Sequence, residues 1–434
     1  MTLDAVAALQ AALRAPTVND GSGAEKKAFE QLHEALREHF PLLHAALDLT
    51  PVGTHGLLFR WPGASAEKPV VLMAHQDVVP IAGVWTHDPF GGEIVDGVIH
   101  GRGTLDDKGQ LVAICAAVEG LLADGFEPAY DVWLSFGSDE ETTGAAARAA
   151  VQELRDQGVE PWFVLDEGGA VAFDAFPGVA APIGVVGVAE KGTTDVRLTV
   201  TGDGGHSSTP RQNGPTARLA RAITRLDRMS MPVRLPVPTV EMFEQIAPYA
   251  AKPMRPVLAN AGRLAPALAR LLTRLGPEPA ALTRTTVAIT TLEGSPAANV
   301  IASAATAGVN LRIMVGETVA EVVERLRAAI GDKQVEIEVV RAGEPSPVSP
   351  RDEAFAKITE TIADVFPEAV PAPYTVMAAT DSRFFYEISD RVYRFAPFRM
   401  TAAQRATIHA ADENIRVDDY LDGIRFYRRL IESL

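Results

Sequence analysis

The chain has 434 residues, which exceeds one ordinary hydrophobic core and favours two domains. Its formal net charge of −16 argues against nucleic acid as a partner, because there is no basic excess to neutralise phosphates, and it disfavours anionic membrane surfaces. Cys115 is the only cysteine, so an intrachain disulfide and a zinc site built from several thiolates are excluded. No run of about 20 apolar residues and no signal-peptide pattern is present, so we expect a cytoplasmic protein.

The N-terminal part predicts helices followed by strands. Apolar residues recur at helical spacing over residues 2–14, and a second helix is expected over 24–39. Strand-like patterns follow at 56–60 and 70–74. The histidines of this part, interpreted as solvated and without a catalytic role, are His33, His39, His44 and His55.

The apolar run at residues 70–74 predicts a strand that is buried on both faces, as in a parallel sheet. His75 and Asp77 follow it and share one side of an extended chain. Open α/β sheets bind their ligands at the carboxyl ends of parallel strands. The pair therefore indicates a metal ligand with a supporting carboxylate, or a catalytic dyad; the alternative is a polar strand end that faces solvent.

A strand expected at 94–100 leads into GRGTLDDKG, residues 101–109. Asp106 and Asp107 then precede a helix whose apolar stripe includes Cys115, which we interpret as core packing. An acidic pair before a helix is often only an N-cap, so this motif alone leaves two interpretations open.

Two further strands end in acidic residues. The run 131–137 is followed by Glu140 and Glu141, and the run 162–165 is followed by Asp166. With His75, three strands of a parallel sheet would bring ligand-type side chains to one edge. Carboxylates crowded in this way repel one another unless cations neutralise them, so the convergence predicts a metal site.

The middle of the chain predicts a smaller inserted domain with the order β-α-β-β-α-β, the split βαβ arrangement. Its expected elements are the strand 193–201, the helix 215–228, the strands 285–292 and 305–315, the helix 318–330 with a capping box from Thr318 and Glu321, and a strand from 335. A helical segment at about 232–284 interrupts it and could cover the cleft or form a subunit contact. The α/β pattern resumes after 349, with helices expected at 352–366 and 418–434.

Seven motifs in this order resemble the M20 family of metallopeptidases. They are His75-x-Asp77, GRGTLDDKG, Glu140-Glu141, Asp166, GGHSS at 204–208, Asn299-Val300-Ile301, and His409 followed by Glu413. HQDVVP, LDEGG and TDSR are most similar to the carboxypeptidase S-like branch.

The resemblance implies an α/β fold of the zinc-peptidase type, in which a mixed, mostly parallel sheet carries helices on both faces. It adds an inserted α+β ferredoxin-like lid. The expected domains are a catalytic domain over 1–190 and 343–434 and a lid and dimerisation domain over 191–342, with the helical insertion at about 232–284. A homodimer through the lid is the implied partner.

The resemblance also assigns the metal ligands. His75 and Asp166 would bind one zinc ion, Glu141 and His409 the other, and Asp106 would bridge both, with Co2+ or Mn2+ as substitutes. It implies a cis peptide bond between Asp106 and the next residue. Nitrogen and carboxylate ligands suit zinc, and two divalent cations would neutralise the crowded carboxylates.

Catalytic roles follow from the same resemblance. Glu140 would be the general base, and Asp77 would hold His75 in the correct tautomer. His206 would stabilise the oxyanion, from its own or a partner subunit. The expected substrate contacts are Asn299, Arg312 and, on weaker grounds, Arg383.

Three positions depart from the usual family pattern, namely Ala302, Ala410 and Asp412. They remove no ligand, but they put local substrate contacts in doubt. The expected activity is hydrolysis of amide bonds in small peptides or N-acyl amino acids. Carboxypeptidase, dipeptidase and N-acyl-amino-acid deacylase remain open, because specificity depends on pocket shape, and a non-catalytic binding protein on the same scaffold is the alternative of a different class.

Overall fold

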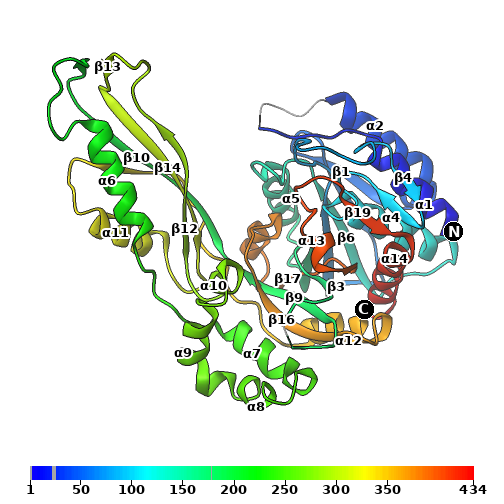
Figure 1. Ribbon diagram of the computed structural model, residues 1–434. Helices are drawn as coiled ribbons and strands as arrows, with labels where there is room; N and C mark the ends of the chain where they lie inside the picture. The colour runs from blue at the N-terminus through cyan, green and yellow to red at the C-terminus, as the bar shows by residue number, and fades with distance from the viewer. Residues whose placement is uncertain (1, 22–25, 177) are drawn as a thin grey trace.

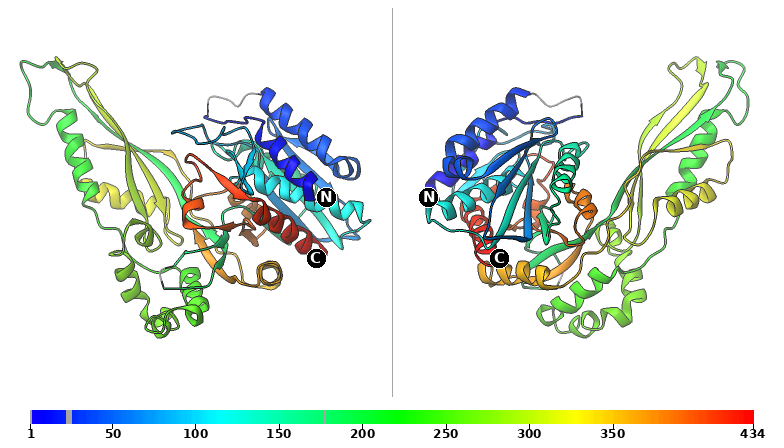
Figure 2. Two further views of the ribbon diagram at one scale, coloured as in Figure 1. Left: turned by 45° about the vertical axis from the view of Figure 1, so that its right-hand side comes forward. Right: turned by 180° about the vertical axis from the view of Figure 1, so that it is seen from behind.

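The computed structural model describes residues 2–21, 26–176 and 178–434, so the predicted start of the second helix at 24 and 25 lies outside the described residues. The chain forms a large α/β domain from which a long lid extends (Figure 1). Views from two other sides show the lid reaching away from the α/β domain (Figure 2).

A mixed sheet forms the centre of the large domain, which we call the catalytic domain. Its spatial order is β1 (Asp48–Val52), β2 (Gly56–Trp61), β6 (Tyr130–Gly137), β3 (Ser65–His75), β7 (Phe163–Asp166), β17 (Val392–Arg394), β9 (Ile183–Glu190), β8 (Ala170–Ala172) and β18 (Arg399–Met400), and β16 (Val370–Val376) also pairs with β9. The central strands β6, β3, β7 and β17 run parallel. The predicted mostly parallel sheet is therefore confirmed.

Helices cover both faces of this sheet, as predicted. One face carries α1 (Thr2–Leu13), α2 (Lys26–His39), α3 (Pro41–Ala46), α4 (Lys108–Ala123), α12 (Glu353–Val365) and α14 (Val417–Glu432). The other carries α5 (Ala145–Asp156) and the 3₁₀ helix η2 (Asp381–Glu387). In β3, Val70 and Leu72 pack in the first core while Val71 and Met73 pack in the second, which explains its uninterrupted apolar sequence.

The predicted single strand at 94–100 is wrong. Residues there form an antiparallel hairpin of β4 (Glu93–Val95) and β5 (Val98–His100), and β5 also pairs with β19 (Asn414–Arg416). The turn residues Asp96 and Gly97 have φ angles of 50° and 77°. An Asp-Gly pair between apolar residues is a hairpin signal, because both turn positions require positive φ.

The lid sheet has the order β12 (Thr286–Glu293), β14 (Ala304–Ile313), β10 (Gly192–Thr201) and β15 (Glu336–Arg341), all antiparallel. Helices α6 (Pro215–Asp227) and α11 (Val319–Ile330) cover one face, which confirms the β-α-β-β-α-β order. A two-residue ribbon of β11 (Gly205–His206) and β13 (Val300–Ile301) lies at the tip farthest from the catalytic domain (Figure 1).

The capping box predicted for α11 is present. Thr318 Oγ1 accepts a hydrogen bond from the amide of Glu321 at 3.2 Å, and Oε2 of Glu321 accepts one from the Thr318 amide at 3.0 Å. Gly331 ends the helix in the left-handed conformation, with a φ of 58°.

The helical insertion packs against the catalytic domain. It comprises α7 (Val237–Ile246), η1 (Ala247–Tyr249), α8 (Arg255–Leu258), α9 (Ala261–Leu272) and α10 (Pro277–Ala281). Phe243 and Ile246 share one buried cluster with Ile183 of β9 and Ala372 of β16. The insertion thus covers the edge region of the catalytic sheet below the lid (Figure 1), not the carboxyl ends of β3, β6 and β7.

The histidines predicted to be solvated are half-buried. Nε2 of His33 lies 2.6 Å from Oε1 of Gln76, and the ring of His55 stacks on Phe29 with 4.6 Å between centroids. Burial is the main cause that lowers the pKa of both histidines. Among the described residues, no helix is long and apolar enough to cross a membrane.

Candidate metal centre

Three neighbouring strands deliver the candidate ligands to one edge of the sheet. β3 lies between β6 and β7 and runs parallel to both, so their carboxyl ends coincide. His75 ends β3, Asp166 ends β7, and Glu140 and Glu141 follow β6 in a turn. The convergence predicted from the sequence is present.

Five side chains form what we call the metal-site cluster: His75, Asp106, Glu140, Glu141 and His409. Two overlapping groups, His75 with Glu140 and Glu141 and Asp106 with Glu141 and His409, each place their ligand atoms within 4.8 Å of one another. Asp166 is in neither group; its Oδ2 accepts a hydrogen bond from the amide of Ser382 at 2.9 Å.

Asp106 lies between the two histidines. Its Oδ1 is 2.8 Å from Nε2 of His75, and its Oδ2 is 3.0 Å from Nε2 of His409. Each carboxylate oxygen therefore faces a different imidazole, as a bridging ligand requires. The peptide bond between Asp106 and Asp107 is cis, as the resemblance implied.

Glu413 holds the loop that carries Asp106. Its Oε1 accepts hydrogen bonds from the amides of Leu105 at 2.7 Å and Asp106 at 3.1 Å. Its Oε2 accepts one from the Gly103 amide at 3.1 Å and one from Nη1 of Arg102 at 2.7 Å. The sequence singled out Glu413 only as a family motif; the structure shows that it shapes the metal-site loop.

Asp77 supports both His75 and the turn after β6. Nδ1 of His75 lies 3.0 Å from the backbone carbonyl of Asp77 and 3.5 Å from its Oδ1. The two carboxylate oxygens of Asp77 accept hydrogen bonds from the amides of Glu140 and Glu141, each at 3.2 Å. One buried carboxylate thus fixes the imidazole and the two glutamates together.

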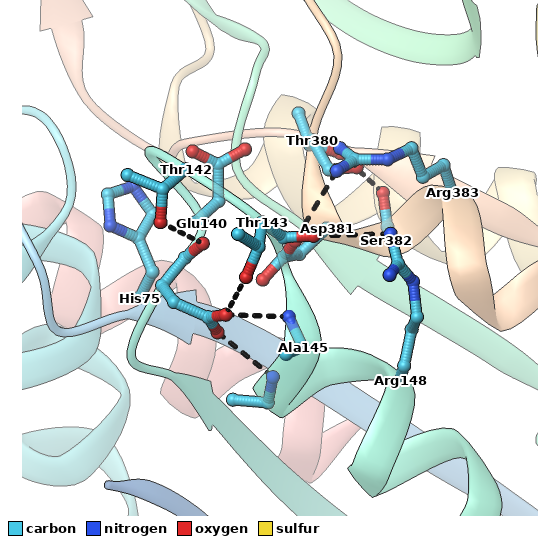
Figure 3. A network of polar contacts seen from close by, with 12 residues as sticks. His75, Glu140, Thr142, Thr143, Ala145, Arg148, Thr380, Asp381, Ser382 and Arg383 are labelled. Carbon is cyan, nitrogen blue, oxygen red and sulfur yellow. Dashed lines mark hydrogen bonds and ion pairs between the residues drawn. The ribbon is translucent and has the colours of Figure 1, made fainter. Parts of the chain in front are cut away.

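The turn after β6 gives the two glutamates different contacts, although both have ligand atoms near His75. The amide of Gly144 donates to the carbonyl of Asp139 at 2.8 Å, which closes the turn before α5. Oε1 of Glu141 lies 3.2 Å from Nε2 of His409, while Glu140 groups with His75. Figure 3 shows His75 and Glu140 beside the turn after β6, with residues 380–383 on its other side.

Comparison with known proteins agrees with this geometry. Residues 71–433 match the model described as Peptidase family M20/M25/M40. The chain belongs to the M20/M25/M40 peptidase family. It is a hydrolase of that family, as the motifs predicted.

Two M20 relatives match over almost the whole chain. The probable carboxypeptidase S-like 2 of Dictyostelium discoideum is 34% identical over 447 residues, covering 100% of this chain and 86% of the relative. The N-fatty-acyl-amino acid synthase/hydrolase PM20D1 of Homo sapiens is 34% identical over 436 residues, covering 98% of this chain and 87% of the relative. The predicted similarity to the carboxypeptidase S-like branch is confirmed.

Solved structures show the same fold. The M20 family metallo-carboxypeptidase Sso-CP2 from Sulfolobus solfataricus has a TM-score of 0.74 at 20% identity, covering 99% of this chain and 98% of that one. The YXEP protein of Bacillus subtilis, described as a dinuclear metal binding M20 peptidase, has a TM-score of 0.61 at 14% identity, covering 99% and 98%.

The electrostatics of the metal-site cluster fit the metals of an M20 enzyme. Hydrogen bonds to Asp106 and Glu141 raise the pKa of His409 to about 10. Burial and the charges of Asp381, Glu141 and Asp106 raise the pKa of Glu140 well above its usual range. These carboxylates therefore demand positive charge, and a divalent metal bound to the histidine nitrogens would supply it. The donor set of imidazole nitrogens and carboxylate oxygens suits such ions.

Two further acidic residues near the cluster carried no role in the sequence analysis. Burial and neighbouring Asp106 and Asp166 raise the pKa of Glu167 well above its usual range. Asp381 is buried, and neither carboxylate oxygen has a hydrogen-bond partner among the described residues. Burial raises the pKa of Asp381 to about 8. Asp381 is part of the TDSR motif. Local sequence patterns do not show which strand of the sheet this motif lies against.

His206 and Asn299 of the lid lie close to each other but away from the metal-site cluster. His206 and Asn299 are exposed, and the Ser207 amide donates to the carbonyl of Asn299 at 3.1 Å. Both belong to the segments at the lid tip, which all views place far from the catalytic domain (Figure 2). Arg312 lies on β14, where Nη1 donates to Thr193 Oγ1 at 2.7 Å. Of the predicted substrate contacts, Arg383 alone lies in the catalytic domain, where Nη1 donates to the carbonyl of residue 380 at 2.6 Å.

Proposed function

We propose that this M20 hydrolase is a two-metal enzyme that cleaves amide bonds in small peptides or N-acyl amino acids by attack of water. The observation that carries the proposal is Asp106, whose two oxygens face His75 and His409 at 2.8 and 3.0 Å. In the proposed ligand set, Asp106 bridges, His75 and Asp166 bind one metal, and Glu141 and His409 bind the other. Two divalent ions held by these residues would supply activation of the attacking water and polarisation of the scissile carbonyl.

Glu140 is the proposed general base. Asp77 binds its backbone amide. The Glu140 carboxylate lies near His75 but lacks the ion-pair contact that Glu141 makes to His409. Burial is the main cause that raises the pKa of Glu140, and a general base works best when its pKa is close to the operating pH. Glu140 would accept a proton from the attacking water and deliver it to the leaving amine nitrogen.

The substrate class remains the open part of the proposal. The names of the two relatives point to a carboxypeptidase and to a hydrolase of N-fatty-acyl amino acids. Both substrate types share an amide bond next to a free carboxylate, for which Arg312 and Arg383 are the proposed partners because their planar guanidinium groups match a carboxylate. A non-catalytic binding protein is disfavoured, because the cluster retains four of the five proposed ligands together with Glu140.

The test is a panel of N-acetyl, N-lauroyl and dipeptide substrates that share one C-terminal residue, assayed with the metal-loaded protein. Hydrolysis of at least one, abolished by a chelator and restored by metal, supports the proposal. Tightly bound but uncleaved ligands would favour a binding protein instead. The ratio of kcat/KM between acyl and dipeptide substrates then decides between deacylase and peptidase.

Zinc is the proposed resident metal, with Co2+ or Mn2+ as substitutes, because two imidazoles and several carboxylates form a common zinc donor set. Elemental analysis of protein purified without added metal checks this identity. The cytoplasmic location expected from the sequence stays a prediction, which fractionation of the source cells would test.

A homodimer through the lid is also proposed, with His206 acting on the partner's substrate. What supports it is the position of His206 at the lid tip, far from the cluster of its own chain (Figure 2). Mixing Glu140→Gln with His206→Ala subunits should restore activity if each site combines residues from two chains. Mixtures that stay as inactive as their components would contradict action between subunits.

A further inference from the structure

A buried ion pair lies at the junction between the catalytic sheet and the lid. Nε of Arg394, at the end of β17, is 3.0 Å from Oε2 of Glu190, at the end of β9. Their side chains are 0% and 2% exposed, respectively. Neither residue belongs to the metal-site cluster. Buried ion pairs often add little net stability, because removing two charges from water offsets their attraction. This pair therefore requires a different explanation.

The ion pair is connected to Asp166 through a short chain of hydrogen bonds. Oε2 of Glu190 also accepts from the amide of Thr380 at 3.1 Å and from its hydroxyl at 3.2 Å. The Thr380 hydroxyl lies 2.6 Å from Oγ of Ser382, whose amide donates to Oδ2 of Asp166 at 2.9 Å. Figure 3 shows Thr380 and Ser382 next to Asp381 and Arg383. This arrangement leaves Oδ1 of Asp166 as the oxygen available to a metal.

Arg394 also lies beside Asp166 on the neighbouring strand, where the backbone of Asp166 is held. It is the register partner of Asp166 in the parallel pairing of β17 with β7, and the following amide, of Phe395, donates to the carbonyl of Asp166 at 2.7 Å. A Cβ at Gly187 would lie 3.0 Å from the Cβ of Arg394, so the strands leave little room for the arginine to shift.

The residues around Glu190 connect this network to both parts of the molecule. The Glu190 amide donates to Ser346 Oγ at 2.9 Å, which joins the two chain segments that enter and leave the lid. Nζ of the next residue, Lys191, donates to the carbonyls of Ala281 and Arg284 at 2.6 and 2.8 Å. Two consecutive residues thus contact different parts of the molecule. Glu190 binds the residues that support Asp166, and Lys191 binds the lid segment before β12.

We propose that Glu190 is a positioning residue for the metal ligand Asp166, acting through Thr380 and Ser382. It orients Oδ1 of Asp166 toward one of the two metals and ties that orientation to the base of the lid. This inference rests on the proposed two-metal function. Supporting groups behind metal ligands change metal affinity by about 10–100-fold when they are removed.

Thr380→Val tests the connection, because it removes only the hydroxyl and keeps the backbone amide. Thr380→Ser restores the hydroxyl and serves as the conservative variant. The matched control is Thr375→Val on the preceding strand β16, since the buried hydroxyl of Thr375 has no hydrogen-bond partner among the described residues. Glu190→Gln is the second, more direct variant.

Metal-free proteins are titrated with Zn2+ by calorimetry and with Co2+ by visible absorption, and their thermal unfolding is measured without metal. Thr380→Val and Glu190→Gln should weaken one of the two binding steps by about 10–100-fold and change the Co2+ spectrum, whereas Thr380→Ser and Thr375→Val should match the wild type.

Unchanged affinities and spectrum in Thr380→Val, with or without a lower unfolding temperature, would reduce the network to a structural role and overturn the inference. A wild-type protein that binds fewer than two ions would overturn the proposed function itself.

Discussion

The edge of the catalytic sheet and the tip of the lid differ in how their functional side chains are held. At the sheet edge, Asp77 and Glu413 are both 0% exposed and bind the backbone on either side of the ligands. At the tip, His206 and Asn299 are exposed and rest on a two-residue ribbon. The backbone that carries the proposed metal ligands and the proposed base is thus held by buried carboxylates. In the proposed mechanism, His206 and Asn299 would act only after lid closure or with a partner subunit.

The largest expected effect, on kcat, distinguishes the proposed general base from the proposed metal ligands at the sheet edge. Glu140→Gln keeps the shape of the side chain and removes its basicity, so kcat should fall by about 10²–10⁴-fold while metal content is retained. Glu141→Gln should instead lose metal, because Glu141 contacts His409 directly. The measurements are kcat and metal stoichiometry for both variants.

Glu160→Gln, at an exposed glutamate before β7, is the matched control and should behave like the wild type in both measurements. Retained turnover in Glu140→Gln together with loss of metal would show that the two neighbouring glutamates have the opposite roles.

The second effect concerns the support of the metal loop. Glu413→Ala leaves the buried guanidinium of Arg102 without its carboxylate and frees the amides of Gly103, Leu105 and Asp106, so the free energy of unfolding should fall by about 3–5 kcal/mol. Denaturant unfolding of the metal-free protein measures the change.

Glu368→Ala is the comparison on the surface, because Glu368 pairs with Arg399 and its side chain is 37% exposed. Its cost should stay below about 1 kcal/mol. Equal costs for the two variants would mean that the loop around Asp106 does not depend on Glu413.

A third effect follows from protonation. The pKa of His409 is raised to about 10, so this imidazole carries a proton at neutral pH until a metal displaces it. Metal affinity should therefore rise with pH, by about tenfold per pH unit for each proton released, and level off above the pKa. Calorimetry in buffers of different ionisation enthalpy measures the released protons. His206→Asn, at the lid tip, should show the same release, whereas pH-independent affinity would contradict His409 as a ligand.

The smallest expected effect tests whether the lid is independent of the metal site. Thr318→Ala removes the N-cap hydrogen bond of α11 and should cost about 1 kcal/mol, seen as faster hydrogen exchange of α11 amides. Metal affinity should not change, and Thr318→Ser should retain the protection. A shift in metal binding would show that lid stability reaches the catalytic sheet.

The sequence predicted those features that depend on local patterns. The apolar run of β3 predicted a central parallel strand. The acidic residues that follow β6 and β7 predicted which edge of the sheet carries the candidate metal site. The capping box of Thr318 fixed the start of α11 correctly, because its two hydrogen bonds join residues three positions apart. Pattern reasoning also placed His75 and Glu141 near each other, although their roles came from the family resemblance.

What the sequence could not provide depends on contacts between distant segments. Glu413 supports residues 103–106 from about 310 positions away, and Ser382 supports Asp166 across 216 positions. By its place in the chain, the helical insertion looks like part of the lid. Its apolar residues are nevertheless buried against β9 and β16 of the catalytic sheet. The Asp96-Gly97 hairpin is different, because its signal was local and was overlooked.

The pairing of β19 with β5 has a consequence for the order in which the protein is made. His409 and Glu413 lie immediately before β19, whereas His75 and Asp106 are translated long before the lid. While the lid is being translated, the part of the centre that contains His75 and Asp106 therefore still lacks the imidazole of His409 and the carboxylate of Glu413. The nascent chain can complete the proposed metal-binding site only after residues 409–416, just before the final helix, have been synthesised, so premature termination anywhere in the lid yields a protein that lacks His409 and Glu413.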